Sequence, residues 1–157
     1  GYNYRMSNIC AGIGRGQMKT LPAYVEKRRE IFRRYKAALA DLPVRFNPVI
    51  SGAEPNFWLT VMVIEKGCGI TPATVAEALA AENIETRPFW KPMHMQPIYR
   101  SRRFFSRRDP AGEALFARGL CLPSGTAMDE RVQDRIIDII RACIMRSRTS
   151  ARTGVGL

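Results

Sequence analysis

The spacing of apolar residues predicts two helices in the first 42 residues of the chain. The first covers residues 7–19 and carries Ile9 and Ile13 on one side. The second begins after the N-cap Thr20, with Pro22 in its first turn, where a helix tolerates proline. Its apolar stripe consists of Leu21, Val25, Phe32, Tyr35, Leu39 and Leu42. The arginines and glutamates on its other faces are expected to form a solvated surface.

Shorter apolar stretches predict an alternation of strands and helices in the rest of the chain. Residues 57–65 are rich in bulky and β-branched side chains between turn-forming residues, which predicts a strand. The other predicted elements are strands over 84–87 and 120–122 and helices over 71–81, 109–118 and 129–146. The polar residues 147–157 are expected to be a disordered tail. This order predicts an α+β domain, in which a small antiparallel or mixed sheet has helices packed on one face, preceded by a long helical arm.

The charge of the chain adds a possible class of partner. The 157 residues include 25 basic and 14 acidic ones, which gives a net charge of +11, and 20 of the basic residues are arginines. Such an excess favours polyanionic partners, which could be nucleic acids, acidic membranes or phosphorylated small molecules. Arginine favours forked contacts with phosphate or carboxylate groups. No apolar stretch approaches the roughly 20 residues that a membrane span requires, so we expect no membrane partner.

The number and spacing of the cysteines and histidines argue against a metal site and against disulfide bonds. The four cysteines, at positions 10, 68, 121 and 143, form no Cys-x-x-Cys pair, and His94 is the only histidine. We therefore expect neither a zinc or other metal site nor a disulfide framework. The cysteines are interpreted as small apolar residues of a protein in a reducing compartment, the cytoplasm.

Two neighbouring segments are unusual enough to carry a function. Residues 87–99 combine three prolines, three aromatic residues and His94, so they could line a pocket with His94 and Gln96 as hydrogen-bonding groups. They could equally be a tightly packed connector. Residues 100–108 hold five arginines around two phenylalanines, a pattern that suits single-stranded nucleic acid but also an ordinary surface loop.

Two stretches also form recognisable motifs. The first reads Gly1-Tyr2-Asn3-Tyr4-Arg5-Met6-Ser7-Asn8 and continues with Ala11-x-Ile13-Gly14-x-x-Gln17. The second reads Arg-Pro-x-Trp-Lys-Pro-Met-His and ends with His94-Met95-Gln96-Pro97. Together they resemble the sugar aminotransferases of the DegT/StrS family, over about residues 1–145. The second motif is similar to members that aminate C4 of a nucleotide-linked 4-keto-6-deoxy sugar.

This resemblance implies the C-terminal portion of a pyridoxal-phosphate-dependent transaminase of fold type I, which acts as a homodimer. The family's Schiff-base lysine lies upstream, in the large domain. The resemblance therefore implies that this chain contains no catalytic residue. It also implies that the chain by itself is inactive and does not bind the cofactor. Residues 1–20 would be the interface turn and helix that join the large domain, and residues 21–146 would be the small C-terminal domain.

The resemblance also implies roles for four residues. Asn3 matches an asparagine that reaches across the dimer to the cofactor phosphate of the neighbouring subunit. His94 matches a position near the sugar substrate, Gln96 is its neighbour, and Arg5 is a candidate for the anionic site. The amino donor is expected to be glutamate, in the biosynthesis of a surface polysaccharide or glycan. The alternative is a basic nucleic-acid-binding or regulatory module.

The loop of residues 100–108 departs from the family because it is unusually basic. It is a candidate contact for the nucleotide diphosphate, or a loop without a ligand.

Overall fold

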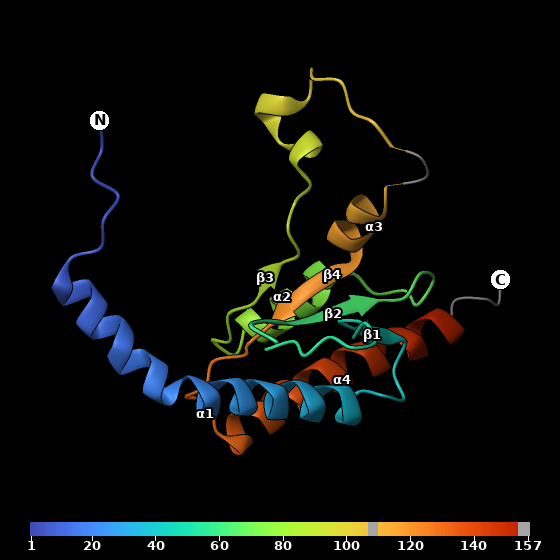
Figure 1. Cartoon of the computed structure of the whole chain (residues 1–157). Helices are drawn as coiled ribbons and strands as arrows, with labels where there is room; N and C mark the ends of the chain where they lie inside the picture. The colour runs from blue at the N-terminus through green and yellow to red at the C-terminus, as the bar shows by residue number, and fades with distance from the viewer. Residues whose placement is uncertain (107–109, 154–157) are drawn as a thin grey trace.

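A computed structural model describes residues 1–106 and 110–153 of the chain, with side chains as far as Ser147. In chain order, the elements are α1 (Asn8–Ala38), β1 (Val44–Phe46), β2 (Thr60–Ile64), α2 (Pro72–Ala80), β3 (Arg87–Pro88), the 3-10 turns η1 (Met93–Met95) and η2 (Pro97–Tyr99), α3 (Ala111–Arg118), β4 (Gly119–Leu122) and α4 (Glu130–Thr153). Figure 1 shows α1 extending well beyond the sheet as a long arm, while residues 89–106, which follow β3, project on another side.

The four strands form one antiparallel sheet in the order β1-β2-β4-β3. Its centre is the pair β2–β4, in which Met62 lies opposite Leu120 and Thr60 lies opposite Leu122. Since side chains alternate along a strand, these residues share one face of the sheet. The α+β class that the sequence predicts is therefore confirmed, and the sheet is the antiparallel one of the two alternatives.

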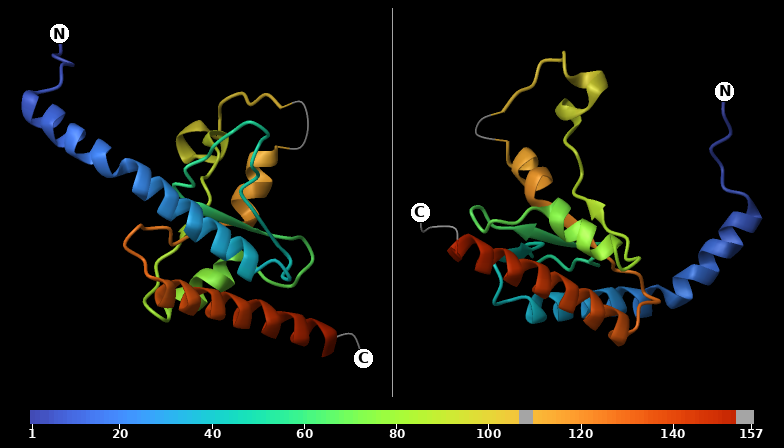
Figure 2. Two further views of the ribbon diagram at one scale, coloured as in Figure 1. Left: turned by 60° about the horizontal axis from the view of Figure 1, so that its bottom comes forward. Right: turned by 180° about the vertical axis from the view of Figure 1, so that it is seen from behind.

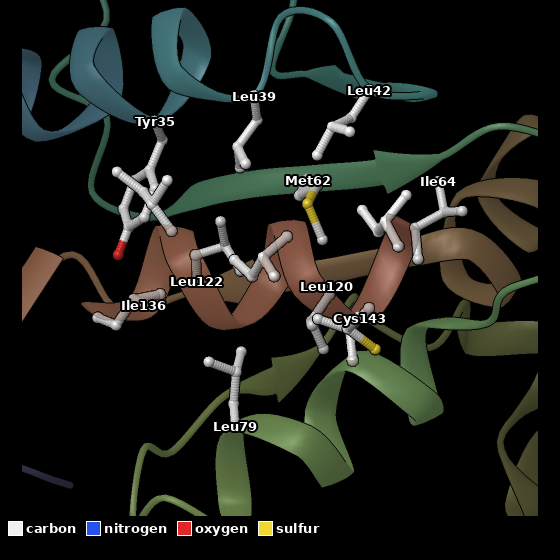
Figure 3. Packing of buried hydrophobic residues seen from close by; sticks show 14 of the residues in the cluster. Tyr35, Leu39, Leu42, Met62, Ile64, Leu79, Leu120, Leu122, Ile136 and Cys143 are labelled. Atoms are coloured by element: carbon white, nitrogen blue, oxygen red, sulfur yellow. The ribbon is translucent and has the colours of Figure 1, made fainter. Parts of the chain in front are cut away.

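The hydrophobic core lies between this face and three helices. Figure 3 shows Tyr35 of α1, Leu39 directly after it, Leu79 of α2 and Ile136 of α4 pointing toward the strand residues of the sheet. All four of these side chains are 0–1% exposed. Helices α1, α2 and α4 thus cover one face, as predicted, whereas α3 lies at the beginning of β4 (Figure 1).

The prediction of two separate helices before residue 42 is wrong, because α1 is one continuous helix. Ser7 is its N-cap, accepting a hydrogen bond from the backbone N–H of Cys10 over 3.2 Å, and Thr20 and Pro22 lie inside it. An interior proline removes one hydrogen bond and bends a helix. Figures 1 and 2 show the first part of α1 running at an angle to the second part, which alone packs on the core.

The predicted charged face of α1 is exposed at Glu26, Glu30 and Arg33, and other arginines of the helix also contact distant parts of the fold. Arg28 and Arg29 donate hydrogen bonds of 2.6 and 3.1 Å to backbone carbonyls of residues 58 and 55, in the segment between β1 and β2. Nη2 of Arg34 donates to both carboxylate oxygens of Asp134 in α4, over 2.8 and 2.9 Å. These arginines therefore bind other parts of the fold to α1.

Several boundaries also differ from the prediction. β1 was not expected, and the strand expected over 84–87 is a two-residue strand over 87–88. α4 continues to Thr153, beyond the expected end at Arg146, and residues 154–157 of the expected tail lie outside the described residues. The expected helix start at Asp109 is also outside them, and α3 is described from Ala111.

The described residues contain no helix long and apolar enough to cross a membrane. They also contain no cluster of three potential metal ligands from histidine, cysteine, aspartate and glutamate. All four cysteines are free thiols, and burial raises the pKa of Cys121 and of Cys143.

Candidate functional site

Residues 89–106, which follow β3, are folded into a series of tight turns. Its base is held to the sheet, where the backbone N–H of Phe89 donates to the carbonyl of Gly119 over 3.3 Å. Pro92 immediately precedes η1 and Pro97 begins η2, so their fixed backbone angles favour these turns. A further turn follows, in which the N–H of Arg102 donates to the carbonyl of Tyr99 over 2.9 Å. The segment, here called the histidine loop (residues 89–106), is therefore an ordered scaffold for side chains.

His94 is fixed within this loop on two sides. Its Nε2 lies 2.7 Å from Oε1 of Glu113 in α3, and its ring stacks on Phe104 with 3.8 Å between the ring centres. A carboxylate only accepts hydrogen bonds, so the proton of this contact is on Nε2 of the histidine. The side chain is 21% exposed. The arrangement holds the imidazole in one orientation and leaves Nδ1 free to bind another group.

A pocket of about 320 Å³ opens beside His94. Its lining residues are Met93, His94, Tyr99, Arg102, Arg103 and Phe104. The guanidinium carbon of Arg103 lies 4.6 Å from the ring centre of Phe105, a cation–π contact. The pocket therefore combines aromatic surfaces with two positive charges and the imidazole.

Gln96 follows His94 by two residues and contacts the backbone of the same loop. Its side-chain amide faces the backbone carbonyl of Lys91, 3.5 Å away, and it does not line the pocket. In this structure Gln96 braces the histidine loop, while His94 is the residue presented to the pocket.

Asn3 and Arg5 lie in the extended segment before α1. The side-chain oxygen of Asn3 accepts a hydrogen bond from the backbone N–H of Arg5 over 3.0 Å, which forms a local turn. Both residues are exposed. Since only the oxygen of Asn3 is engaged, its side-chain NH₂ remains available as a donor, which suits a phosphate oxygen.

The structure does not bring the two predicted groups of site residues together. Figures 1 and 2 show the segment before α1 and the histidine loop well apart in every view. None of the described pockets contains residues from both. Asn3 and Arg5 can therefore share one site with His94 only with the participation of another protein surface.

Two features of the structure, Glu113 and a second, larger hollow, have no signal in the sequence. Glu113 is 19 residues from His94, and no local pattern links the two positions. The hollow, of about 830 Å³, lies on the sheet face opposite the core, where Val61 and Val63 meet Phe89 and Leu115. Next to it, the rings of Trp58 and Trp90 lie 6.1 Å apart, so the segment before β2 contacts the base of the histidine loop.

Comparisons with known proteins identify relatives of the whole described fold. The model of the DegT/DnrJ/EryC1/StrS aminotransferase family matches residues 1–141. The Bacillus subtilis protein EpsN, whose name describes a pyridoxal phosphate-dependent aminotransferase, is 47% identical over 143 residues. A GDP-perosamine synthase of Vibrio cholerae is 30% identical over 134 residues. These matches cover 89% and 85% of this chain but 36% of each relative, so the chain spans little more than a third of their length.

A solved structure agrees with the sequence matches. DesI, determined in the presence of its TDP-sugar product, superposes with a TM-score of 0.84 at 31% identity, over 98% of this chain and 40% of DesI. The resemblance expected from the two motifs is thereby confirmed. The chain belongs to the DegT/DnrJ/EryC1/StrS aminotransferase family.

Proposed function

We propose that this chain is the C-terminal portion of a cytoplasmic, pyridoxal-phosphate-dependent aminotransferase that acts on a nucleotide-linked 4-keto-6-deoxy sugar. The amino donor in this proposal is glutamate, and the product is a building block for a surface polysaccharide or glycan. Family membership supports the reaction class. The named activity of the Vibrio cholerae relative and the TDP-sugar product of DesI support a sugar nucleotide as substrate.

The observation that carries the proposal is the fixed imidazole in the histidine loop. His94 is oriented by Glu113 and Phe104 and faces a pocket lined by two arginines, an arrangement that suits a polar, anionic substrate such as a sugar nucleotide. We assign His94 to the sugar, with Gln96 and Arg5 as further substrate contacts.

Asn3 is proposed to bind the cofactor phosphate of a neighbouring subunit. Its free side-chain NH₂ fits this role, and a hydrogen bond to a charged group contributes about 1.5–3 kcal/mol. Pyridoxal phosphate, when bound in the complete enzyme, supplies the electron sink for amino transfer. The separation of Asn3 from His94 supports a homodimer in which each chain contributes to two sites. In this proposal residues 1–20 join the chain to the large domain, and residues 21–146 are the small domain.

The test uses the longer protein that contains this chain. We expect it to aminate a nucleotide-linked 4-keto-6-deoxy sugar in the presence of glutamate and pyridoxal phosphate, with the product identified by mass spectrometry. Asn3→Ala should weaken cofactor retention by about tenfold or more, whereas His94→Ala should lower kcat/KM for the sugar nucleotide with cofactor content unchanged. Asn56→Ala, which removes a similar local turn next to Trp58, is the control for the first variant.

Two results would contradict these assignments. Unchanged cofactor retention in Asn3→Ala would remove Asn3 from the phosphate. The chain of 157 residues alone should show no turnover and no new visible absorbance with pyridoxal phosphate. Borohydride reduction that attached the cofactor to Lys91 would contradict the proposal that the reactive lysine lies elsewhere.

A further inference from the structure

The larger hollow of the protein has an apolar floor that the chain leaves uncovered. Val61 and Val63 of β2 form the middle of this floor, and Phe46, Phe89 and Leu115 surround them. All of these residues except Val61 are only half-buried. The volume of about 830 Å³ is at the upper end of the range of roughly 300–1,000 Å³ that is typical of binding sites. An apolar hollow of this size in contact with water indicates that another group binds there.

The rim of the hollow is positively charged. Arg45, Lys66 and Arg118 line it together with one carboxylate, that of Glu65. Nε of Arg45 lies 2.9 Å from Oε1 of Glu65, so this ion pair compensates one of the three cations. Among residues 1–106 and 110–147, Lys66 and Arg118 contact no carboxylate, and Arg118 donates instead to the backbone carbonyl of Ala114 over 3.3 Å. Two uncompensated positive charges therefore lie beside the apolar floor.

The combination of an apolar floor and a cationic rim restricts what can occupy the hollow. A nucleic acid would bind the rim through its phosphates but would leave the aliphatic part of the floor in water. A second copy of the chain carries the same net charge of +11, so its approach would bring like charges together. A polypeptide segment that carries both apolar side chains and carboxylates matches the floor and the rim at once.

A second apolar surface lies at the beginning of α1. Ile9 and Ile13 are about one helical turn apart, so they lie on the same side of the helix, and they are 77% and 62% exposed. Met6, just before the helix, is 72% exposed. Figures 1 and 2 show this part of α1 standing away from the sheet. Because the chain leaves two separate apolar surfaces uncovered, an occupant that covers both must be larger than a short peptide.

The length of the relatives points to the source of this occupant. The chain spans 36% of the length of EpsN, so a longer protein of this kind has enough further polypeptide to cover both surfaces. We propose that the hollow docks a segment of that further polypeptide, with apolar side chains on Val63 and Leu115 and carboxylates at Lys66 and Arg118. Because the segment belongs to the same polypeptide, its effective concentration is on the order of millimolar, and modest contacts suffice. The inference rests on family membership and on the hollow, and it is independent of the proposed reaction.

The test measures how fast iodoacetamide labels residue 63 of the variant Val63→Cys. Mass spectrometry of peptides separates this label from any on the four native cysteines. We expect labelling in the longer protein to be about tenfold or more slower than in the 157-residue chain, because the docked segment must first leave the hollow. The matched control is Arg131→Cys, at an exposed position of α4, which should react equally fast in both proteins. Circular dichroism checks that each variant keeps the fold.

A reversal of charge at the rim tests the role of the cations. In the longer protein, Lys66→Glu should raise the labelling rate at residue 63 by about twofold to fivefold, because it replaces a partly exposed ion pair by a repulsion. Lys36→Glu makes the same change at an exposed position of α1 that does not line the hollow, and it should leave the rate unchanged. Equal labelling of residue 63 in the two proteins, or equal effects of the two reversals, would overturn the proposal. Protection that appears in the 157-residue chain alone as its concentration rises would overturn it in favour of a second copy.

A dye titration of the unaltered proteins covers the case in which Val63→Cys does not fold. The dye 8-anilinonaphthalene-1-sulfonate combines aromatic rings with a negative charge, so it matches the floor and the rim. We expect its fluorescence to rise with the 157-residue chain, to rise less with the Lys66→Glu variant of that chain, and to stay low with the longer protein. An equal rise with the unaltered chain and the longer protein would contradict docking.

The outcome for this inference can be separated from that for the proposed function. If the longer protein aminates sugar nucleotides while residue 63 stays equally reactive in both proteins, the docking surface is wrong and the aminotransferase proposal stands. If residue 63 is protected as expected but no sugar nucleotide is aminated, the aminotransferase proposal is wrong and the docking surface stands.

Discussion

Buried polar side chains of this protein are satisfied by contacts between elements distant in sequence. The hydroxyl of Tyr35 donates to the carbonyl of Pro123 over 3.1 Å, and the side-chain amide of Gln133 donates to the carbonyl of Ile31 over 2.8 Å. The hydroxyl of Ser124 accepts from the backbone N–H of Thr60 over 2.9 Å. The exception among the described side chains is the hydroxyl oxygen of Thr60, which is buried without a hydrogen-bond partner.

Replacing Thr60 should therefore stabilise the domain. In Thr60→Val a methyl group takes the place of the unpaired hydroxyl, and removing such a buried polar group should raise the free energy of unfolding by about 1 kcal/mol. Urea denaturation measures the change. Thr71→Val is the matched control with the opposite sign, because the hydroxyl of Thr71 caps α2 and its loss costs about 0.5–2 kcal/mol. A loss of stability in Thr60→Val would contradict the structure around this residue.

At the same scale, the sequence predicted only part of the candidate site. His94 was predicted because a lone histidine among prolines and aromatic residues is locally conspicuous. Its partner Glu113 was not predicted, because a glutamate in the first turn of a helix is also common as a solvated residue, stabilised by the positive end of the helix dipole. The roles of Asn3, Arg5, His94 and Gln96 remain predictions.

Among the elements, those with strong local patterns were predicted and those fixed by distant contacts were not. β2, α2 and β4 lie in the apolar stretches that predict them, because β2 and β4 are buried along nearly their whole length and α2 buries Val75 and Leu79, one helical turn apart. β1 has only three residues and exists through pairing with β2, which no local pattern reveals. The break expected between Lys19 and Thr20 does not occur, because α1 continues through both residues and past Pro22 and bends instead.

The junction of α3 and β4 depends on a glycine. A Cβ at Gly119 would lie 2.6 Å from the carbonyl oxygen of Leu115 and 2.8 Å from Cβ of Phe89. Gly119→Ala should therefore displace α3 or the base of the histidine loop and lower the free energy of unfolding by about 1–3 kcal/mol.

Thermal denaturation of Gly119→Ala and Gly125→Ala tests this prediction. A Cβ at Gly125 would meet no atom within 4 Å, so that variant should retain its melting temperature within a few degrees. Equal melting temperatures for the two variants would contradict the close approach at residue 119.

For the molecule as a whole, burial of weak acids sets the response to alkaline pH. Burial raises the pKa of Tyr35, Cys121 and Cys143 above their ordinary values of 10.0 and 9.0. Below those ordinary pKa values the groups are neutral in the folded and in the unfolded chain, so their burial does not make stability depend on pH. Above about pH 9 the unfolded chain releases protons that the folded chain retains, so stability falls as pH rises.

Tyr35→Phe isolates one of these groups. Without the phenol, the decline of the unfolding free energy above pH 10 should be shallower, while stability at neutral pH should fall by about 1 kcal/mol for the lost hydrogen bond. Urea denaturation at neutral and alkaline pH gives both quantities. The exposed Tyr24→Phe is the control, and an identical alkaline decline in the two variants would contradict the assignment to Tyr35.

The contact between Trp58 and Trp90 determines what intrinsic fluorescence reports for this protein. These are the only two tryptophans of the chain, and both lie where the segment before β2 meets the base of the histidine loop, away from the helical core. Tryptophan emission therefore reports on the environment of that junction, whereas far-ultraviolet dichroism reports on the helices, so the two signals describe different parts of the fold.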